Sequence, residues 1–270
     1  MALNLTKYGR KAMLDHMFGR IAHPFPTNRY LALFTADPTV EGTLTDEVAV
    51  GGYARVEISD LMGDADLALK QIANTFDIIF PPVSSAVSAI THMGVMDVAM
   101  PSAGNMLFHG PLETPRTLAV GERFKIRVGQ FTVECLFGIA KYGCKAWLDH
   151  VFGRTAYTMP SPYLTLLSAE TTEAGGLTAE LSGGGYARVA LASLMADAVL
   201  SGGQISNSSD IQFPNPSADW LPVVGYAVLD TARLGVGNMT YFGTLTSARL
   251  IYGGGDPFLI EPGNLVFVAR

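Results

Sequence analysis

The chain of 270 residues contains one sequence twice. Residues 7–20 read KYGRKAMLDHMFGR and residues 141–154 read KYGCKAWLDHVFGR, so 11 of 14 positions are identical. Further matches follow in the same order: 30–33 with 163–166, 51–56 with 184–189, 77–81 with 210–214, and 104–106 with 237–239. A solenoid unit has roughly 20–50 residues, whereas this period has the length of a whole domain. The sequence predicts two tandem domains, 1–134 and 135–270, and the junction lacks the Gly, Ser and Pro of a flexible linker, so we expect them to be closely joined.

Each copy begins with a helical pattern and continues as short apolar runs separated by Gly, Pro, Asn and Asp. Apolar side chains recur at helical spacing over 8–18 and 142–152, and no alternation of strands and helices follows. This order favours a mainly β fold of two tandem antiparallel β-sandwich domains, each preceded by a short N-terminal α-helix. The expected strands are 30–35, 53–58, 75–80, 89–96, 105–112, 122–128 and 131–136, then 163–168, 186–191, 210–213, 223–229, 239–245, 258–260 and 265–268.

Composition excludes several classes of protein. Hydrophobic residues make up 49% of the chain and charged residues 16%. This composition is too apolar and too weakly charged for a disordered chain. The net charge of −6 has the wrong sign for binding nucleic acid through its phosphates. No run of 18 apolar residues predicts a membrane span, and charges in the first 20 residues interrupt any signal-peptide core. We therefore expect a protein made in the cytoplasm.

No motif predicts catalysis. Asp15–His16 and Asp149–His150 are neighbours on their helices, about 100° apart, so the members of each pair do not face each other. No Ser or Cys completes a triad by motif. We interpret both pairs as helix surface or as a contact between the domains. The chain is not expected to be an enzyme, and no catalytic residue is assigned.

Cofactor and metal motifs fail in the same way. Glycines 183–185 and 253–255 are not followed by Lys-Ser/Thr and do not open a helix after a buried strand, so they predict turns or bulges. Asp64 and Asp66 lack the further carboxylates of a calcium loop. The histidines have no HExxH or CxxC companions. We assign no cofactor-binding and no metal-ligating residues.

The two cysteines, Cys135 and Cys144, are too few for a disulfide framework. A bond between them is geometrically feasible but unsupported, because Arg10 takes the place of Cys144 in the first copy. Free thiols are the expectation.

A repeated Arg lies beside a repeated Tyr in both copies. Tyr53 and Arg55 belong to Gly-Gly-Tyr-Ala-Arg-Val, and Tyr186 and Arg188 to its second occurrence. Arg stacks on aromatic rings and binds carboxylates. Two interpretations stay open: a cross-strand pair within one sheet, or a contact between subunits.

Together these motifs resemble a family of tailed-phage virion proteins, small β-structured modules commonly labelled tail-fibre proteins. The resemblance rests on 30–35, 51–56, 72–74, 77–81 and 104–112 and on their counterparts in the second copy. Trp220 matches the family's Trp-containing segment, whereas Val87 stands opposite it in the first copy. Such proteins have one copy per chain as a rule. The resemblance implies no catalytic residues. The candidate assembly contacts are Arg55, Arg188, Tyr53, Tyr186 and Trp220.

Three functions follow, in order of preference. The first is capsid decoration: an outer-surface virion protein that cements the shell by bridging major capsid subunits, since no heptads predict a fibrous shaft. The second is a tail, baseplate or fibre component that contacts the host. The third is a carbohydrate-active enzyme or lectin, for which Asp77 with Asp97, and Asp210 with Asp230, are the repeated carboxylates.

The expected partners are the major capsid protein and copies of the chain itself, with a trimer among the expected states. Nucleic acid, a membrane and a small-molecule ligand are not expected partners. Capsid versus tail location, copy number and the oligomeric state stay open.

Overall fold

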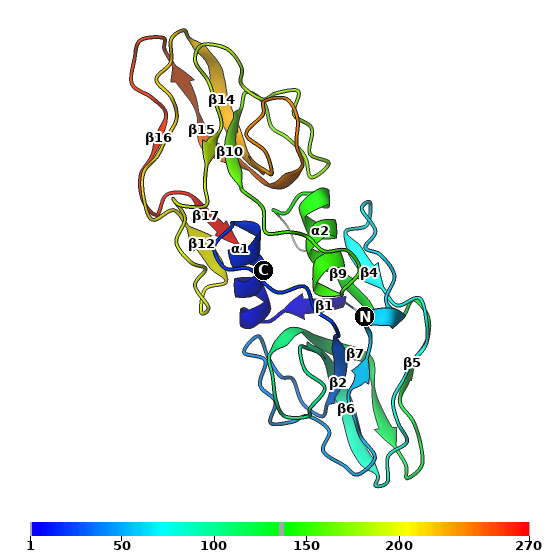
Figure 1. Cartoon of the computed structure of the whole chain (residues 1–270). Coiled ribbons are helices and arrows are strands. Elements are labelled where there is room, and N and C mark those ends of the chain that lie inside the picture. The colour runs from blue at the N-terminus through cyan, green and yellow to red at the C-terminus, as the bar shows by residue number, and fades with distance from the viewer. Residues whose placement is uncertain (1, 135–137, 270) are drawn as a thin grey trace.

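The computed structural model describes residues 2–134 and 138–269. It is mainly β, with 35% strand and 9% helix, and consists of two repeats of about 130 residues, each with a small helix near its start and curled β sheets. The repeats lie at opposite ends of an elongated molecule, and the two helices lie side by side in the middle (Figure 1). The predicted fold class and duplication are confirmed.

Repeat 1 is built around the hairpin of β6 and β7. Its elements are β1 (Ala2–Leu5), α1 (Lys7–Met17), β2 (Tyr30–Phe34), β3 (Val56–Glu57), a 3-10 turn (Ser59–Leu61), β4 (Gln71–Ala73), β5 (Ile78–Ile79), β6 (Val87–Met96), β7 (Met106–Leu118), β8 (Lys125–Ile126) and β9 (Thr132–Glu134). Its main sheet has the order β3-β2-β6-β7-β1-β9-β4, and β5 pairs with β8 separately. Antiparallel pairing was predicted, but β1 and β9 pair in parallel, which ties the start of the repeat to its last strand.

Repeat 2 reproduces this plan around the hairpin of β14 and β15. Its elements are α2 (Lys141–Val151), β10 (Tyr163–Leu167), β11 (Val189–Ala190), β12 (Gln204–Ser206), β13 (Ile211–Gln212), β14 (Trp220–Leu229), β15 (Met239–Ile251), β16 (Leu259–Ile260) and β17 (Val266–Val268). The main sheet has the order β11-β10-β14-β15, while β12 pairs with β17 and β13 with β16.

Each helix is docked against its own repeat through a glycine. Thr6 caps α1 by accepting a hydrogen bond from the Gly9 N–H at 3.1 Å. A Cβ on Gly9 would lie 2.2 Å from the carbonyl oxygen of Leu107 on β7, and one on Gly143 would lie 2.8 Å from that of Thr240 on β15. Only glycine permits this approach of helix and strand.

The core runs through both repeats without a break. Phe18, at the end of α1, packs against Tyr241 and Phe267 of repeat 2, with ring centroids 5.1 and 4.6 Å apart. Phe152, at the end of α2, packs against Phe108 of repeat 1 at 5.8 Å. Each helix thus contributes its terminal aromatic ring to the core of the other repeat, and the expectation of closely joined domains is confirmed.

The structure corrects several predicted elements. The segment predicted as a strand over 53–58 pairs only at β3, and β7 continues to Leu118, well past residue 112. β4 and β12 were not predicted, because a three-residue strand with one buried side chain has too short a pattern to detect. The strand predicted over 131–136 is observed as β9, and its last two residues lie outside the described residues. Within the described residues, neither α-helix is long enough to cross a membrane, since each has 11 residues.

Candidate functional site: the interface between the repeats

The best-defined polar site lies where each helix meets the other repeat. Asp15 of α1 accepts a hydrogen bond from the backbone N–H of Ala198 at 2.6 Å. Asp149 of α2 accepts the matching bond from the N–H of Ala65, also at 2.6 Å. Both aspartates are buried. The two contacts are related by an approximate two-fold, as in an isologous dimer interface.

Lysines complete each carboxylate contact. Lys11 donates to Asp15 Oδ2 at 2.7 Å and to the carbonyl of Ala198 at 2.9 Å. Lys145 donates to Asp149 at 2.7 Å and to the carbonyl of Ala65 at 2.8 Å. In each case the aspartate accepts a hydrogen bond from the N–H, and the lysine donates one to the carbonyl, of the same alanine. The two side chains together therefore bind a loop of the other repeat in the way that a neighbouring β-strand binds a backbone.

Arginines beyond the helix ends make a second pair of matching contacts. Arg20 binds Asp197 at 3.0 Å and the carbonyl of Ala192 at 2.6 Å. Arg154 binds Asp64 at 3.3 Å. These arginines are not among the candidate residues predicted from the sequence, although both lie in the repeated Phe-Gly-Arg that follows each helix.

Two histidines meet at the centre of this interface. The rings of His16 and His150 stack with their centroids 4.6 Å apart. His16 Nδ1 accepts the backbone N–H of His23 at 3.1 Å, and its Nε2 lies 2.8 Å from the carbonyl of Tyr157. His150 makes the same contacts with the N–H of Tyr157, at 3.1 Å, and the carbonyl of His23, at 2.9 Å. Since Nδ1 accepts and Nε2 donates, both rings are neutral and protonated on Nε2.

The interface is asymmetric at one position, where His23 of repeat 1 corresponds to Tyr157 of repeat 2. The guanidinium of Arg29 lies 2.9 Å from His23 Nε2 and donates to the carbonyl of Val151 in repeat 2 at 2.8 Å. Burial lowers the pKa of Arg29 to about 10. The Tyr157 hydroxyl and Trp147 Nε1 are buried there without a hydrogen-bond partner among the described residues.

Burial keeps the histidines uncharged. Desolvation, assisted by nearby Arg29, lowers the pKa of His23 and of His150 to about 4, and desolvation also lowers the pKa of His16. Their ring nitrogens bind backbone groups or Arg29, and within 2–134 and 138–269 no cluster of three or more His, Cys, Asp or Glu residues could hold a metal. Of the two interpretations of Asp15–His16 and Asp149–His150, the contact between domains is confirmed and the exposed helix surface is wrong, since all four side chains are buried.

The repeated arginines lie inside each repeat rather than on its surface. Arg55 forms a two-bond ion pair with Glu47, at 2.7 Å to each oxygen, and donates to the carbonyls of Val98 and Ala103. The side chains of this pair have no exposed surface, at 0% each. Arg55 thus holds the loop between β6 and β7 in place. Because its side chain is buried, it does not touch another chain directly and affects such a contact only by fixing the conformation of this loop.

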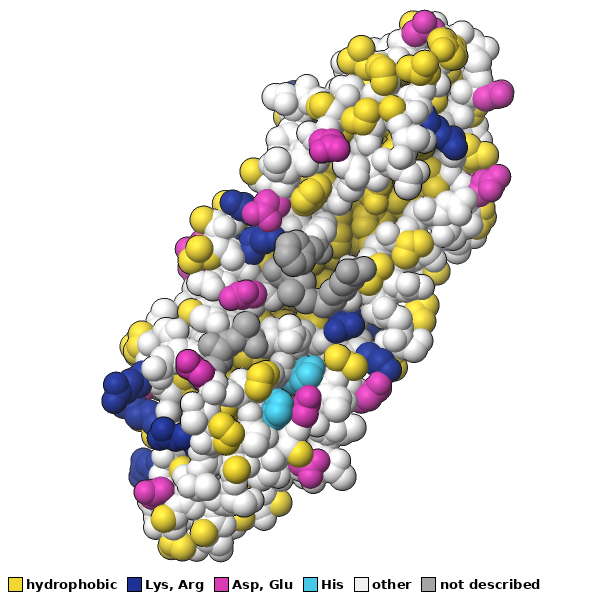
Figure 2. Space-filling view, turned by 180° about the vertical axis from the view of Figure 1, so that it is seen from behind, with side chains coloured by type: hydrophobic (Ala, Val, Ile, Leu, Met, Phe, Trp, Pro, Cys, Tyr) yellow, Lys and Arg dark blue, Asp and Glu magenta, His cyan; other side chains and the backbone are white. Residues whose placement is uncertain are grey.

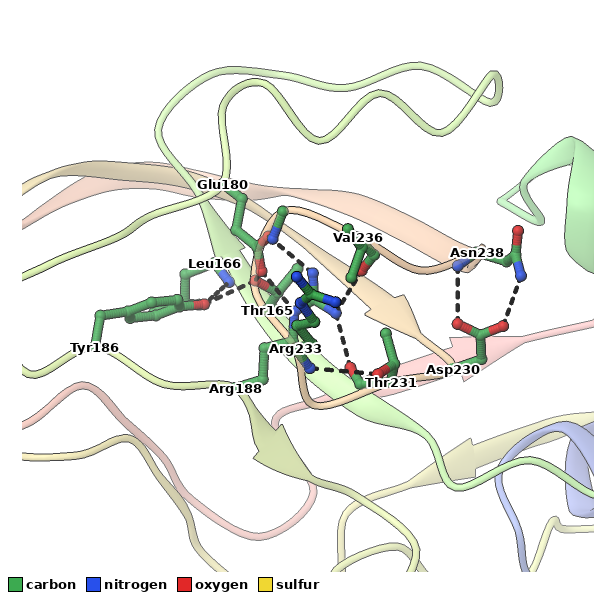
Figure 3. A network of polar contacts seen from close by, with 11 residues as sticks. Thr165, Leu166, Glu180, Tyr186, Arg188, Asp230, Thr231, Arg233, Val236 and Asn238 are labelled. Atoms are coloured by element: carbon green, nitrogen blue, oxygen red, sulfur yellow. Dashed lines mark hydrogen bonds and ion pairs between the residues drawn. The ribbon is translucent and has the colours of Figure 1, made fainter.

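Repeat 2 contains the same network (Figure 3). Arg188 binds Glu180 at 2.6 and 2.8 Å and the carbonyls of Thr231 and Val236 at 2.7 and 2.9 Å. Desolvation raises the pKa of Glu180, but hydrogen bonds from Arg188, Thr165 and Gly235 outweigh it and lower the pKa overall.

The aromatic candidates support these networks. Tyr53 accepts a hydrogen bond from the Leu33 N–H at 3.0 Å, and Tyr186 accepts one from the Leu166 N–H at 2.7 Å. Trp220 is buried and donates to the carbonyl of Gly184 at 3.0 Å. Their role in contacts between chains stays a prediction.

Most of the candidate carboxylates have structural partners, and Asp210 is the one for which no ion pair or side-chain hydrogen bond is seen among the described residues. Asp77 binds Lys125, and Asp97 and Asp230 each hold the side chain and backbone N–H of an asparagine eight residues later. Asp66 accepts hydrogen bonds from two backbone N–H groups in a turn. Gly183, Gly184, Gly185 and Gly254 have positive φ, as predicted for turns.

The expectation of a free thiol is wrong for Cys144, which is disulfide-bonded. The absence of a cysteine at Arg10 in repeat 1 carried no information about pairing in repeat 2. Cys135 lies outside the described residues.

The chain is thus a mainly β protein of two repeats that reciprocal polar contacts hold together. A family model described as "Podophage GP4 fiber I protein gp80" matches residues 4–134 and, again, residues 138–267. The chain belongs to this family of phage fibre proteins, of which it contains two consecutive copies, and the resemblance seen in the sequence is confirmed. No curated protein sequence matches the chain significantly.

Proposed function

We propose that the chain is a structural subunit of a phage tail fibre, built as a covalent pseudo-dimer of two fibre modules. The family is one of virion structural proteins associated with the tail. Of the functions considered, the family description favours the fibre component over capsid decoration. No observation on the described residues favours the bridging of capsid subunits.

The observation that carries this proposal is the reciprocal clamp between the repeats. Asp15 and Asp149 each hold a backbone N–H of the opposite repeat, and the aromatic cores interpenetrate. Such an interface fixes the two modules as one elongated body (Figure 1). A rigid rod-like body suits a mechanical element that bridges two distant contacts.

The proposed role is not catalytic. Asp97 and Asp230 hold turns, and Arg55 and Arg188 form ion pairs within the fold. The proposed partners are copies of the chain and other virion proteins, with the molecule on the outer surface of the particle.

Copy number per purified particle tests this proposal. Quantitative mass spectrometry against the major capsid protein should give a small number of chains, set by the symmetry of the tail. Immunogold labelling should place them at the tail vertex. Hundreds of copies distributed over the shell would instead support capsid decoration, and absence from the particle would refute both.

A further inference from the structure

The two repeats have the same groove at their outer ends. In repeat 1 it lies between β7 and β8 and encloses a cavity of about 550 Å³. In repeat 2 it lies between β15 and β16 and encloses about 630 Å³. The lining residues correspond, among them Leu112 with Leu245 and Phe124 with Phe258. A groove that occurs twice is a built feature of the repeat.

A large irregularity in strand pairing lies beside the groove. His92 pairs with Pro111 and Ile90 with Arg116, so the four residues 112–115 of β7 lie opposite one residue of β6. The same irregularity places 245–248 of β15 opposite one residue of β14. Extra residues on one strand of a pair bend that strand, here beside the groove.

The groove of repeat 1 combines an apolar floor with an open strand edge. Leu112, Phe124 and Ile126 are buried along it. Among the described residues β8 pairs only with β5. Next to this pair, the N–H of Phe80, which follows β5, donates a hydrogen bond to the carbonyl of Phe124, which precedes β8, at 2.9 Å. In an antiparallel ladder the next residue then turns its backbone outward, so the N–H and carbonyl of Lys125 face the groove.

The rim of this groove is basic, on a chain whose net charge is −6. Arg116, Lys125 and Arg127 line it, opposed by Glu113. Lys125 is paired with Asp77 at 2.5 Å, whereas no ion pair within 4.0 Å involves Arg116 or Arg127 in the part of the chain that the structure describes. Figure 2 shows basic side chains gathered along one edge of the repeat 1 end.

The groove of repeat 2 has diverged in charge. Leu259 and Glu261 take the places of Lys125 and Arg127. Arg249, the counterpart of Arg116, lies over the Phe258 ring at 5.7 Å from its centroid. The groove of repeat 1 therefore has two arginines without an ion pair and a lysine, whereas the groove of repeat 2 has one arginine and a glutamate in the corresponding places.

We propose that the groove between β7 and β8 binds an extended acidic segment of a partner protein by strand addition to β8. A strand seated there alternates its side chains, so apolar residues reach Leu112, Phe124 and Ile126 while acidic residues meet Arg116 and Arg127. The open backbone edge favours a polypeptide over a polyanion without amide groups. The proposal goes beyond the structural role and does not depend on where the chain sits in the virion.

Fluorescence anisotropy on the full chain tests this, with a fluorescein-labelled peptide of alternating Val and Glu, about ten residues long. It should bind, and the double variant Arg116→Glu/Arg127→Glu should weaken binding by about tenfold or more, since two attractive contacts become repulsive. Arg249→Glu, the matched change in repeat 2, should leave binding unchanged. Circular dichroism checks that each variant folds.

Three outcomes would overturn the proposal. A peptide of the same composition with its Val and Glu in separate blocks should bind much more weakly; equal binding would mean charge attraction without strand addition. Equal displacement by polygalacturonate would assign the groove to polyanions in general. Self-association of the chain that is lost in Arg116→Glu/Arg127→Glu would assign it to a second copy.

Discussion

The imidazole rings of His16 and His150, one from each repeat, stack with their centroids 4.6 Å apart. Each ring makes one hydrogen bond to the backbone of its own repeat and one to the backbone of the other, and the two sets of bonds match. Each Nδ1 accepts a hydrogen bond from a backbone N–H, so protonation of that nitrogen would break the bond. Protonation of both rings would also place two positive charges in contact, close to Arg29. The interface between the repeats therefore requires both rings to be neutral.

Acid should loosen this interface. The pKa values of His23 and His150 are lowered to about 4 from an ordinary 6.5, so between these values the unfolded chain binds more protons than the folded chain. The free energy of unfolding should fall as the pH falls through that window. Calorimetry should show the melting temperature decreasing steadily from pH 7 to pH 5.

A substitution separates this effect from general acid destabilisation. In His150→Asn the amide oxygen can replace Nδ1 as acceptor but does not titrate, so the decrease in melting temperature should become smaller. His92→Asn is the control, because His92 lies on β6, outside the interface between the repeats, with Asp37 as its neighbour. An unchanged pH dependence in His150→Asn would contradict the assignment.

The two helix aspartates should be energetically equivalent. Asp15→Ala leaves the buried N–H of Ala198 without its acceptor, and Asp149→Ala does the same to Ala65. Each change should cost about 2 kcal/mol in the free energy of unfolding, the usual range for a lost hydrogen bond to a charged group. Urea denaturation measures both, and a clear inequality would contradict the two-fold relation of the contacts.

The sequence predicted the fold class and the duplication, and it left Asp15–His16 and Asp149–His150 open between a helix surface and a contact between the domains. It could not identify their partners, because these are backbone groups of Ala65, Ala198 and the loops after each helix. Every residue except proline has a backbone N–H, so the identity of a residue does not indicate whether this group is bound by a side chain. The exchange of terminal aromatic rings between repeats was also hidden, since Phe18 has the same apolar pattern whichever core it enters.

The arginine networks were missed for a different reason. Arg55 and Arg188 bind Glu47 and Glu180, eight residues earlier, across a glycine-containing turn and not along one strand or helix, so no periodic pattern connects the partners. The repetition of both residues at the same spacing was the available signal. The grooves were undetectable, since the irregularity beside them follows from pairing with β6 and β14.

Helix docking should be sensitive to a single methyl group. Gly9→Ala would place a Cβ 2.2 Å from the Leu107 carbonyl oxygen, and Gly143→Ala would place one 2.8 Å from that of Thr240. Both should destabilise the fold, Gly9→Ala more strongly, since its contact is shorter and backbone atoms cannot move aside cheaply. Thermal denaturation measures the order.

A matched control exists for these changes. Gly176 has an ordinary negative φ, and a Cβ there would meet nothing within 4 Å. Gly176→Ala should therefore be neutral or slightly stabilising. Equal destabilisation by Gly9→Ala and Gly176→Ala would mean that the close approach of α1 to β7 is not made in solution.

Removing one member of a buried ion pair should be costly in either repeat. Arg55→Met leaves the Glu47 carboxylate buried without its guanidinium and frees the carbonyls of Val98 and Ala103, which should cost about 3–5 kcal/mol. Arg55→Met/Glu47→Leu removes both charges and should recover much of that loss. Chemical denaturation of the single and double variants measures this coupling.

The same variants separate folding from assembly. Because the side chains of Arg55 and Glu47 have no exposed surface, a double variant that regains stability should also be incorporated into phage particles normally. Incorporation is measured as chains per particle after complementation of a phage lacking the protein. A stable double variant that fails to incorporate would mean that the loop between β6 and β7, whose carbonyls Arg55 holds, contacts another chain.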